Sequence, residues 1–223
     1  MSIRFLGTRM TSIHSAMEGD FDAVLFDLLS ALMDSWSLWD DLAGDTDLGR
    51  KWRMHYLNAA SHAVGYTPYL SLVGDSAKAV GISRLQALGL GTRWNELTPW
   101  PEAPTLIAKL ASKTKIGVVT NCSEELGYKC ANRLGTQFDV VVTAERAGCY
   151  KPNPRIYQEA IAEIGLAPER ILYVAGSPLD VGGATAVSMS VYWHNRIGLI
   201  DSEASSLAIE TSASLDGVWN LVL

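Results

Sequence analysis

Residues 21–34 read Phe21-Asp22-Ala23-Val24-Leu25-Phe26-Asp27-Leu28-Leu29-Ser30-Ala31-Leu32-Met33-Asp34, and this stretch decides the fold. Its first half is an apolar run bounded by Asp22 and Asp27, which is typical of a buried strand in a parallel sheet. Ligands of such sheets bind beyond the carboxyl ends of the strands, where Asp27 would stand. Because an unpaired buried charge is costly, Asp27 is either a residue that caps a turn or a nucleophile. Its partners elsewhere in the chain distinguish the two.

The composition is that of an ordinary globular protein. The chain has 223 residues, of which 48% are hydrophobic and 19% charged, enough for one sizeable core or for a core domain with a small inserted domain. The net charge is −6, and no run of Lys or Arg stands out. This argues against a nucleic acid or an anionic membrane as a partner. One or two local cations would still suffice to hold a small anionic substrate.

The cysteines and the N-terminal segment predict a cytoplasmic protein. Cys122, Cys130 and Cys149 match no common zinc pattern and suit reduced thiols. Met1–Asp20 lacks a continuous apolar block, so we expect no signal peptide there. No apolar window approaches the length of a transmembrane helix, so we expect no membrane partner.

The spacing of apolar residues predicts a helical insertion after the first strand, followed by alternating strands and helices. The inserted helices are expected at Gly49–Ala63, Leu70–Val80 and Ile82–Leu90. Further along, the expected strands are 115–121, 140–143, 171–175 and 191–194, and the expected helices are 105–112, 123–133, 154–164 and 181–187. Such alternation predicts an α/β fold with a parallel sheet, helices on both faces and an inserted helical cap.

Polar residues gather where the predicted strands end. Asp27 follows the first strand, Thr120 and Asn121 the second, and Asp180 lies in a loop after a later strand, while Lys151 lies in a loop between elements. Each has an ordinary structural interpretation. Thr120 and Asn121 could cap a helix, Lys151 could lie on the surface, and Asp180 could cap the following helix.

In this order, these residues resemble the motifs of the haloacid dehalogenase (HAD) superfamily. The matching motifs are Phe26-Asp27, Val119-Thr120-Asn121, Tyr150-Lys151-Pro152-Asn153-Pro154-Arg155-Ile156-Tyr157 and Val174-Ala175-Gly176-Ser177-Pro178-Leu179-Asp180. The resemblance extends from about Asp22 to Gly198. It implies a HAD-like Rossmannoid core domain at residues 1–34 and 103–223, with a helical cap domain at residues 35–102.

The neighbours of Asp27 bear on which reaction of this superfamily applies. Phosphatase members carry a second Asp two positions after the nucleophile, where this chain has Leu29, and a Gly-Asp pair in the fourth motif, where it has Gly176-Ser177. Magnesium prefers a near-octahedral shell of oxygen ligands. The resemblance therefore implies a site without a metal or another cofactor, and phosphoryl transfer becomes the less favoured reaction.

In the dehalogenase-like branch, the aspartate attacks carbon. By this resemblance, Asp27 displaces a leaving group at C2 of a small 2-substituted carboxylic acid, and water then hydrolyses the aspartyl ester. Lys151 would keep Asp27 ionised, and Asp180 would position Lys151 or the hydrolytic water. The substrate-binding residues expected on this side of the pocket are Leu28, Thr120, Asn121 and Ser177.

The cap would supply the rest of the pocket. The branch uses an arginine ahead of a tyrosine; Arg50, six residues before Tyr56, fits best, and Arg53 is the competitor. His194 stands at a strand end, where it could transfer a proton or have a structural role. The aromatic residues expected to line the pocket are Tyr69, Trp36 and Trp39.

Departures from the branch predict an unusual leaving group. Relatives usually carry Tyr-Gly-Thr after the nucleophile, where this chain has Leu29-Ser30-Ala31 without the threonine hydroxyl, and Ser-Ser-Asn where it has Ala175-Gly176-Ser177. The Asp27 stretch and Trp193-His194-Asn195-Arg196 are similar to the branch that contains L-azetidine-2-carboxylate hydrolases. These enzymes open the ring to 4-amino-2-hydroxybutyrate. We therefore expect this substrate first; the acids that could meet its ring cation, or simply lie on the surface, are Asp34, Asp40 and Asp41.

Three alternatives stay open. An (S)-2-haloacid dehalogenase would use the same residues in the same roles. A HAD phosphatase and a non-catalytic HAD-fold binding protein are the other two. The joint presence of Asp27, Lys151 and Asp180 favours an enzyme, because a binding module needs no such set. A homodimer formed through the cap is also expected by resemblance.

Overall fold

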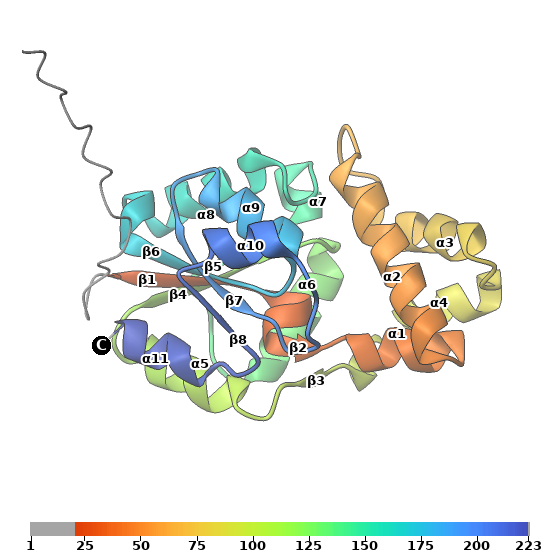
Figure 1. The fold of residues 1–223 in the computed structure, drawn as a ribbon, viewed down its shortest axis with the longest axis horizontal. Coiled ribbons are helices and arrows are strands. Elements are labelled where there is room, and N and C mark those ends of the chain that lie inside the picture. The colour runs from red at the N-terminus through yellow and green to blue at the C-terminus, as the bar shows by residue number, and fades with distance from the viewer. Residues whose placement is uncertain (1–20, 223) are drawn as a thin grey trace, which may run out of the picture.

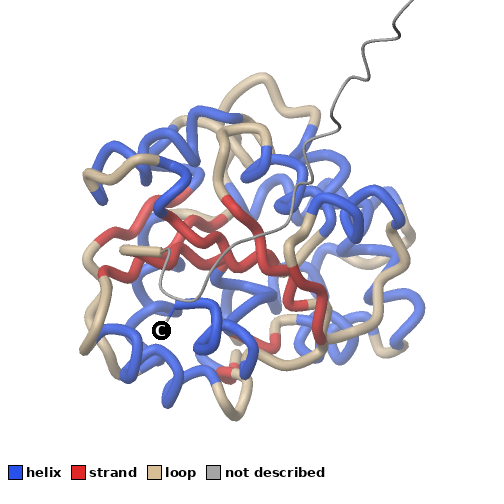
Figure 2. The backbone as a smooth tube through the Cα atoms, turned by 60° about the vertical axis from the view of Figure 1, so that its left-hand side comes forward, coloured by secondary structure: helices blue, strands red, loops and turns tan. Residues whose placement is uncertain are grey.

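A six-stranded parallel sheet forms the centre of the molecule (Figures 1 and 2). The computed structural model describes residues 21–222, so the predictions made for Met1–Asp20 lie outside it. The strands are ordered β5-β4-β1-β6-β7-β8, and each pairs with its neighbours in parallel. Their bounds are β1 Ala23–Asp27, β4 Lys115–Thr120, β5 Val140–Thr143, β6 Ile171–Ala175, β7 Ser190–His194 and β8 Glu210–Ser212. The predicted α/β fold is confirmed; β8 was not predicted.

Strand β1 lies in the middle of the sheet because it is apolar on both faces. Phe26 is fully buried and aligns with Val118 of β4 and Val174 of β6. Complete burial of one such side chain stabilises the fold by about 1.5–3 kcal/mol. The parallel register also brings the carboxyl ends of β1, β4 and β6 to one edge of the sheet, where Asp27 is the last residue of its strand.

Helices cover both faces of the sheet. Their bounds are α5 Ala103–Ala111, α6 Glu124–Ala131, α7 Ala144–Ala147, α8 Pro154–Ile164, α9 Pro178–Thr185, α10 Ser202–Leu207 and α11 Asp216–Val222. In Figure 1, α8, α9 and α10 lie above the sheet, and α5 and α11 lie below it. The sequence explains the ends of α8: Asn153 caps the first turn by accepting from the N–H of Arg155, and Gly165 ends the helix with φ 73°.

Residues 36–96 form a helical insert beyond the carboxyl edge of the sheet, at the right of Figure 1. Its helices are α1 Trp36–Ala43, α2 Thr46–Ser61, α3 Tyr69–Ala79 and α4 Arg84–Thr92. Two short antiparallel strands, β2 (Met33–Asp34) and β3 (Thr98–Pro99), connect it to the core. Helices α2, α3 and α4 follow the prediction, whereas α1 was missed. Of the helices within residues 21–222, none has the length and apolar character needed to cross a membrane.

A π-helical turn, Leu28–Leu32, follows Asp27 directly. The N–H of Met33 donates to the carbonyl of Leu28 and closes the turn, while the Asp27 side chain caps its first N–H groups. All five residues of the turn are buried. Such turns are rare and occur mostly at functional sites, and this one was not predicted.

Candidate active site

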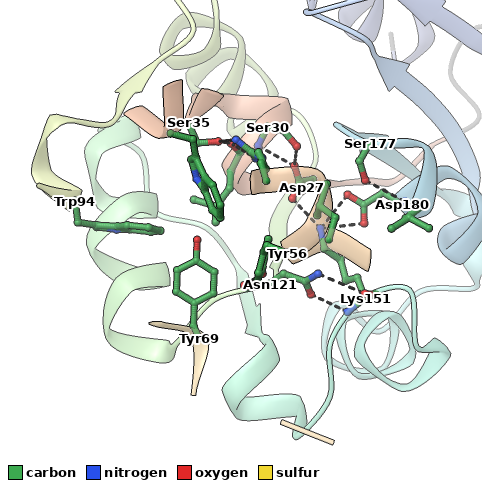
Figure 3. Close-up of a pocket in the computed structure, with 15 residues that line it drawn as sticks. Asp27, Ser30, Ser35, Tyr56, Tyr69, Trp94, Asn121, Lys151, Ser177 and Asp180 are labelled. Carbon is green, nitrogen blue, oxygen red and sulfur yellow. Dashed lines mark hydrogen bonds and ion pairs between the residues drawn. The ribbon is translucent and has the colours of Figure 1, made fainter. Parts of the chain in front are cut away.

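The two carboxylate oxygens of Asp27 have different partners (Figure 3). Oδ2 accepts hydrogen bonds from the N–H of Ser30 (2.9 Å), the hydroxyl of Ser30 (2.6 Å) and the N–H of Ala31 (3.1 Å). Oδ1 accepts from the ammonium group of Lys151 at 2.7 Å. Four donors therefore fix a carboxylate that is only 4% exposed.

Lys151 joins two carboxylates. Its Nζ lies 2.7 Å from Asp27 and 3.0 Å from Asp180, and it also donates to the carbonyl of Val119 at 3.0 Å. Lys151 is itself 4% exposed, so it is not a surface lysine. A buried ammonium group is stable only with partners of this kind, since its desolvation is costly.

Asn121 fixes the backbone that carries Lys151. Its Oδ1 accepts from the N–H of Lys151 at 2.7 Å, and its Nδ2 donates to the carbonyl of Lys151 at 3.4 Å. The hydroxyl of Tyr56, on cap helix α2, donates to the carbonyl of Asn121 at 2.8 Å and ties the cap to this loop. Thr120, which was predicted to bind substrate, is fully buried against Cys122 and does not line the cavity.

Asp180 lies in the first turn of α9. Its Oδ1 accepts from the hydroxyl of Tyr157 at 2.9 Å, and its backbone N–H donates to Oγ of Ser177 at 3.3 Å. Ser177 is thus the residue that caps α9, which leaves the carboxylate of Asp180 to Lys151 and Tyr157. The interpretation of Asp180 as a helix cap is excluded.

The three charges set one another's pKa. Burial raises the pKa of Asp27, but attraction to Lys151 and hydrogen bonds from Lys151 and Ser30 lower it more, so it lies below its usual value. Burial also raises the pKa of Asp180, and here it outweighs Lys151, giving about 6. Burial lowers the pKa of Lys151, but Asp180 and Asp27 raise it above its usual value. At neutral pH the cluster is therefore an ammonium group between two carboxylates.

A small cavity of about 30 Å³ adjoins this cluster. That volume is room for one or two water molecules. The cavity lies between the core and the insert, and each contributes about half of its wall (Figure 3). From the core come Asp27, Ser30, Asn121, Lys151, Ser177 and Asp180. From the insert come Trp39, Arg53, Tyr56, Tyr69 and Trp94, together with Ser35, which directly precedes it.

Arg53, and not Arg50, is the cap arginine at this cavity. Helix α2 buries the face that carries Trp52, Arg53 and Tyr56, whereas Arg50 is exposed. Arg53 is three positions from Tyr56 and shares its side of the helix, whereas Arg50 is six positions away, about one and two-thirds turns, and points elsewhere. The prediction for Arg50 is therefore corrected in favour of its competitor.

The guanidinium group of Arg53 is held by neutral partners. It donates to Oγ of Ser35 at 2.5 Å and to the carbonyl of Leu29 at 3.4 Å, and it lies 4.0 Å from the ring centroid of Trp36. Among residues 21–222, no carboxylate forms a salt bridge with it. Burial lowers its pKa from the usual value. Because arginine stays protonated in proteins, Arg53 is a buried cation without a salt bridge to residues 21–222, although the charges of Asp27 and Asp34 favour its charged form from a greater distance.

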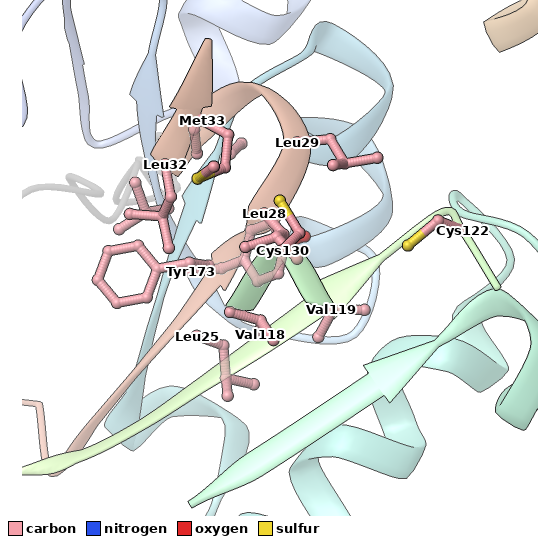
Figure 4. Packing of buried hydrophobic residues seen from close by; sticks show 14 of the residues in the cluster. Leu25, Leu28, Leu29, Leu32, Met33, Val118, Val119, Cys122, Cys130 and Tyr173 are labelled. Atoms are coloured by element: carbon pink, nitrogen blue, oxygen red, sulfur yellow. The ribbon is translucent and has the colours of Figure 1, made fainter. Parts of the chain in front are cut away.

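Of the remaining predicted residues, Tyr69 and Trp39 line the cavity and three do not. Trp36 lies behind Arg53 and supports it. Leu28 is fully buried, with its side chain among core residues such as Val118 and Tyr173 (Figure 4), because the π turn directs Leu29 to the cavity instead. His194 is 1% exposed, and its Nδ1 contacts the carbonyl of Ala31 at 2.8 Å.

Several lining residues were not predicted from the sequence, among them Ser30, Ser35 and Trp94. Ser30 was seen only as a departure from the family, and its hydroxyl reaches Asp27 because of the unpredicted π turn. Trp94 belongs to the insert and Ser35 directly precedes it, and neither lies in a recognisable motif. The sequence signal available for Ser30 was its position, since it is a polar residue three positions after the nucleophile Asp27.

The residues of this site do not fit the magnesium ion that phosphatases of the superfamily use. Both candidate carboxylates, Asp27 and Asp180, are paired with the ammonium group of Lys151, which occupies the place between them. Leu29 and Ser177 supply no further carboxylate. Across residues 21–222, His, Cys, Asp and Glu side chains form no group of three suited to a metal ion.

Comparisons with known proteins agree with this geometry. Over 218 residues the chain is 25% identical to haloacetate dehalogenase H-2 of a Moraxella species, covering 90% of this chain and 97% of the relative. Over 201 residues it is 27% identical to the (S)-2-haloacid dehalogenase of Xanthobacter autotrophicus, covering 82% and 77%. A shorter match, 37% identical over 114 residues and about half of each chain, is to glyceraldehyde 3-phosphate phosphatase of Methanothermobacter thermautotrophicus.

A solved structure shows the same fold. The L-2-haloacid dehalogenase of Xanthobacter autotrophicus with chloropropionic acid covalently bound superposes with a TM-score of 0.67, at 23% identity, covering 83% of this chain and 81% of that one. The family model of haloacid dehalogenase-like hydrolases matches residues 21–187. The chain therefore belongs to the haloacid dehalogenase-like hydrolases.

Proposed function

We propose that this hydrolase displaces the halide from C2 of a small 2-haloacid, with Asp27 as the nucleophile. One observation carries the proposal: a buried, ionised carboxylate and a buried arginine that forms no salt bridge with residues 21–222 line the same cavity. A 2-haloacid has a carbon, C2, that the Asp27 carboxylate can attack, and an anionic group that Arg53 can bind.

In this proposal Lys151 and Asp180 serve the nucleophile. Lys151 keeps Asp27 ionised, since a cation at 2.7 Å favours the charged form of the carboxyl group. Asp180 holds Lys151 from the other side at 3.0 Å, and it lines the cavity, where it can reach a water molecule. Attack by a carboxylate gives an aspartyl ester, which divides one difficult displacement into two easier steps.

Arg53 binds the substrate carboxylate or the departing halide. Its planar guanidinium group suits both, and its support by Trp36 and Ser35 fixes its orientation. The cavity of about 30 Å³ limits the substrate to a small acid. The names of the two relatives matched over most of the chain support the same substrate class, whereas the phosphatase match spans about half of each chain.

A second candidate is L-azetidine-2-carboxylate, which the same nucleophile would open at C2. The observation in its favour is the aromatic wall of Trp39, Tyr56, Tyr69 and Trp94, because aromatic faces attract a ring ammonium group. The acids expected to meet this cation do not line the cavity: Asp34 accepts from Ser37, and Asp41 pairs with Arg93. The relatives reported above favour the haloacid.

A parallel assay discriminates these readings. Purified protein treated with EDTA is offered (S)-2-chloropropionate, L-azetidine-2-carboxylate and, with magnesium restored, a generic phosphate ester. We expect chloride release and a 2-hydroxy acid of inverted configuration from the first. Release of 4-amino-2-hydroxybutyrate would select the second candidate instead, and magnesium-dependent phosphate release alone would rule out both.

Replacing Asp27 by Asn is the direct test of the nucleophile. We expect turnover to fall by on the order of 10⁶-fold, the scale seen when a nucleophile is removed, while circular dichroism still shows a folded protein. Asp216→Asn, an exposed acid in α11, is the matched control and keeps wild-type turnover. Retention of activity by Asp27→Asn would refute the assignment.

We also propose that residues 35–102 act as a cap domain over a core of residues 1–34 and 103–223, and that two chains form a dimer. The narrow cavity supports the role of the cap domain, since a substrate enters only when insert and core separate. Light scattering of the purified protein checks whether two chains form a dimer.

A further inference from the structure

Strand β6 closely approaches the buried charges of the site. Gly176 directly follows this strand, and a Cβ there would be 2.7 Å from Oδ2 of Asp27, and nearer still to the Ser30 hydroxyl. Within the strand, Tyr173 aligns with Leu25 of β1, two residues before Asp27. Because side chains two residues apart point to the same face of a sheet, Tyr173 lies on the face where Asp27 stands. Tyr173 is fully buried and was not predicted as a site residue.

The hydroxyl of Tyr173 is a fourth polar group beside the ammonium group of Lys151. The carboxylates of Asp27 and Asp180 and the carbonyl of Val119 lie 2.7–3.0 Å from Nζ, and the hydroxyl oxygen of Tyr173 lies 3.3 Å from it. An ammonium group has three N–H donors. The three closer acceptors can take all of them, which leaves the Tyr173 hydroxyl to donate its own proton elsewhere.

Asp180 accepts the hydrogen bond of this hydroxyl. Burial, the charge of Asp180 and the hydrogen bond to it raise the pKa of Tyr173 well above its usual value, so the hydroxyl keeps its proton. Tyr157 of α8 donates to the same carboxylate at 2.9 Å. The two tyrosine rings meet edge to face, with centroids 5.4 Å apart. One carboxylate is therefore held by two packed tyrosines, one from a strand and one from a helix.

We propose that Tyr173 is a positioning residue, which together with Tyr157 holds the Asp180 carboxylate ionised and in place. Burial disfavours the ionised form of Asp180, Lys151 of the loop before α8 favours it, and Asp27 of β1 disfavours it. Hydrogen bonds to an ionised carboxylate favour that form. The inference rests on the proposed function only where Asp180 accepts a proton from water; the contact itself does not depend on the substrate.

The Tyr173→Phe variant of the full chain tests this contact. Phenylalanine fills nearly the same space without the hydroxyl, so ionised Asp180 loses one donor. A hydrogen bond to a charged group corresponds to a pKa change of about one unit. The pKa of Asp180, which burial raises to about 6, should therefore rise further by about one unit. Carbon NMR of protein labelled with carbon-13 aspartate, assigned with Asp180→Asn, measures this titration midpoint without any substrate.

The kinetic arm uses (S)-2-chloropropionate. In Tyr173→Phe, the acidic limb of kcat should move to higher pH by the same amount as the titration midpoint. Tyr192→Phe is the matched control, because it removes an equally buried hydroxyl that donates to the carbonyl of Ser214 at 2.6 Å. It should lower stability to a similar degree and leave both the midpoint and the limb unchanged.

A second substitution changes the same hydroxyl in the opposite direction. 3-Fluorotyrosine at position 173 keeps the hydroxyl and makes it a stronger donor, so the Asp180 midpoint should fall. This variant carries the test if Tyr173→Phe does not fold, and a midpoint that stays in place or rises would then contradict the inference.

Two further results would overturn the inference. One is an unchanged Asp180 midpoint in Tyr173→Phe, whatever the kinetics show. The other is an equal shift in Tyr192→Phe, because the shift would then follow from a general change of the fold. If the midpoint moves as expected but the wild-type protein turns over neither (S)-2-chloropropionate nor L-azetidine-2-carboxylate, the contact is supported and the proposed function fails.

Discussion

The candidate active site contains two buried cations, one from the core and one from the insert, and they differ in what neutralises them. In the core, Lys151 lies between Asp27 and Asp180, at 2.7 and 3.0 Å. In the insert, Arg53 contacts a hydroxyl, a carbonyl and the ring of Trp36, and no described carboxylate forms a salt bridge with it. The first cation forms salt bridges with carboxylates of the protein itself. The second interacts with Asp27 and Asp34 only from beyond salt-bridge distance, so a salt bridge to it requires an anion in the cavity.

The difference indicates that the core half of the cavity carries out the chemistry and that the insert half recognises the substrate. The core half of the cavity is a closed hydrogen-bonded network that fixes the nucleophile. The insert half is mostly aromatic, and its one charged group, Arg53, forms no salt bridge with a described residue. Burial of an unpaired cation lowers stability, so its presence indicates a functional requirement. Three variants test this contrast.

The largest effect is expected for Lys151→Met. It leaves Asp27 and Asp180 buried without a cation, so the free energy of unfolding should fall by about 3–5 kcal/mol. Because Asp27 then loses the cation that keeps it ionised and fixes its position, kcat should fall by about 10²-fold. Urea denaturation measures the free energy of unfolding, and steady-state kinetics measures kcat. The exposed Lys129, paired with Glu125, is the control, and Lys129→Met should cost less than about 1 kcal/mol.

Arg53→Met should have the opposite effect on stability. Removing a buried, unpaired charge should raise the free energy of unfolding by about 1 kcal/mol. The variant loses a charged hydrogen bond to the substrate, of about 1.5–3 kcal/mol, so kcat/KM should fall by about 10- to 100-fold. Arg50→Met, on the exposed side of the same helix, should leave both unchanged.

Thermal unfolding and substrate titration check the Arg53 prediction. Arg53→Lys keeps the positive charge but removes the planar guanidinium that stacks on Trp36, so it shows whether the charge alone is enough for substrate binding. A stability loss in Arg53→Met with unchanged kcat/KM would show that Arg53 is structural and that the contrast is mistaken.

The smallest effect is expected in the pH profile. Burial raises the pKa of Asp180 to about 6, and that of Asp27 lies below its usual value. As pH falls below about 6, Asp180 becomes protonated and can no longer accept a proton from water, whereas Asp27 stays ionised. We therefore expect kcat to decrease about tenfold per pH unit below this point. Asp180→Asn should lower kcat and abolish this limb; a limb that persists in the variant would assign it to another group.

The core half of the site could be predicted from sequence because its residues follow strands. An apolar run with an acid at its end identified Asp27, and the alternation of strands and helices brought Asn121 and Asp180 to the same edge. Lys151 required the family resemblance, since a lysine in a loop has no distinctive pattern. The α/β fold follows from the same alternation.

The insert half was predicted less well. Its helices were mostly found, yet Arg50 was chosen over Arg53 by its distance from Tyr56 rather than by helical phase. Trp52 and Tyr56 already marked the buried face, and Arg53, beside the first and three residues from the second, belongs to it. The Ser30 hydroxyl was not predictable, because a π turn has no sequence signature comparable to that of an α-helix.

The close approach of Gly176 to Ser30 has an evolutionary consequence. By the resemblance described above, the dehalogenase branch usually carries glycine where this chain has Ser30 and serine where it has Gly176, which implies an exchange of the two side chains. Because a Cβ at position 176 would collide with the Ser30 hydroxyl and the N of Ala31, a serine cannot be accepted at both sites at once. The two positions should therefore covary across homologues, and a lineage crossing from one arrangement to the other passes through a Gly/Gly intermediate that lacks the hydroxyl.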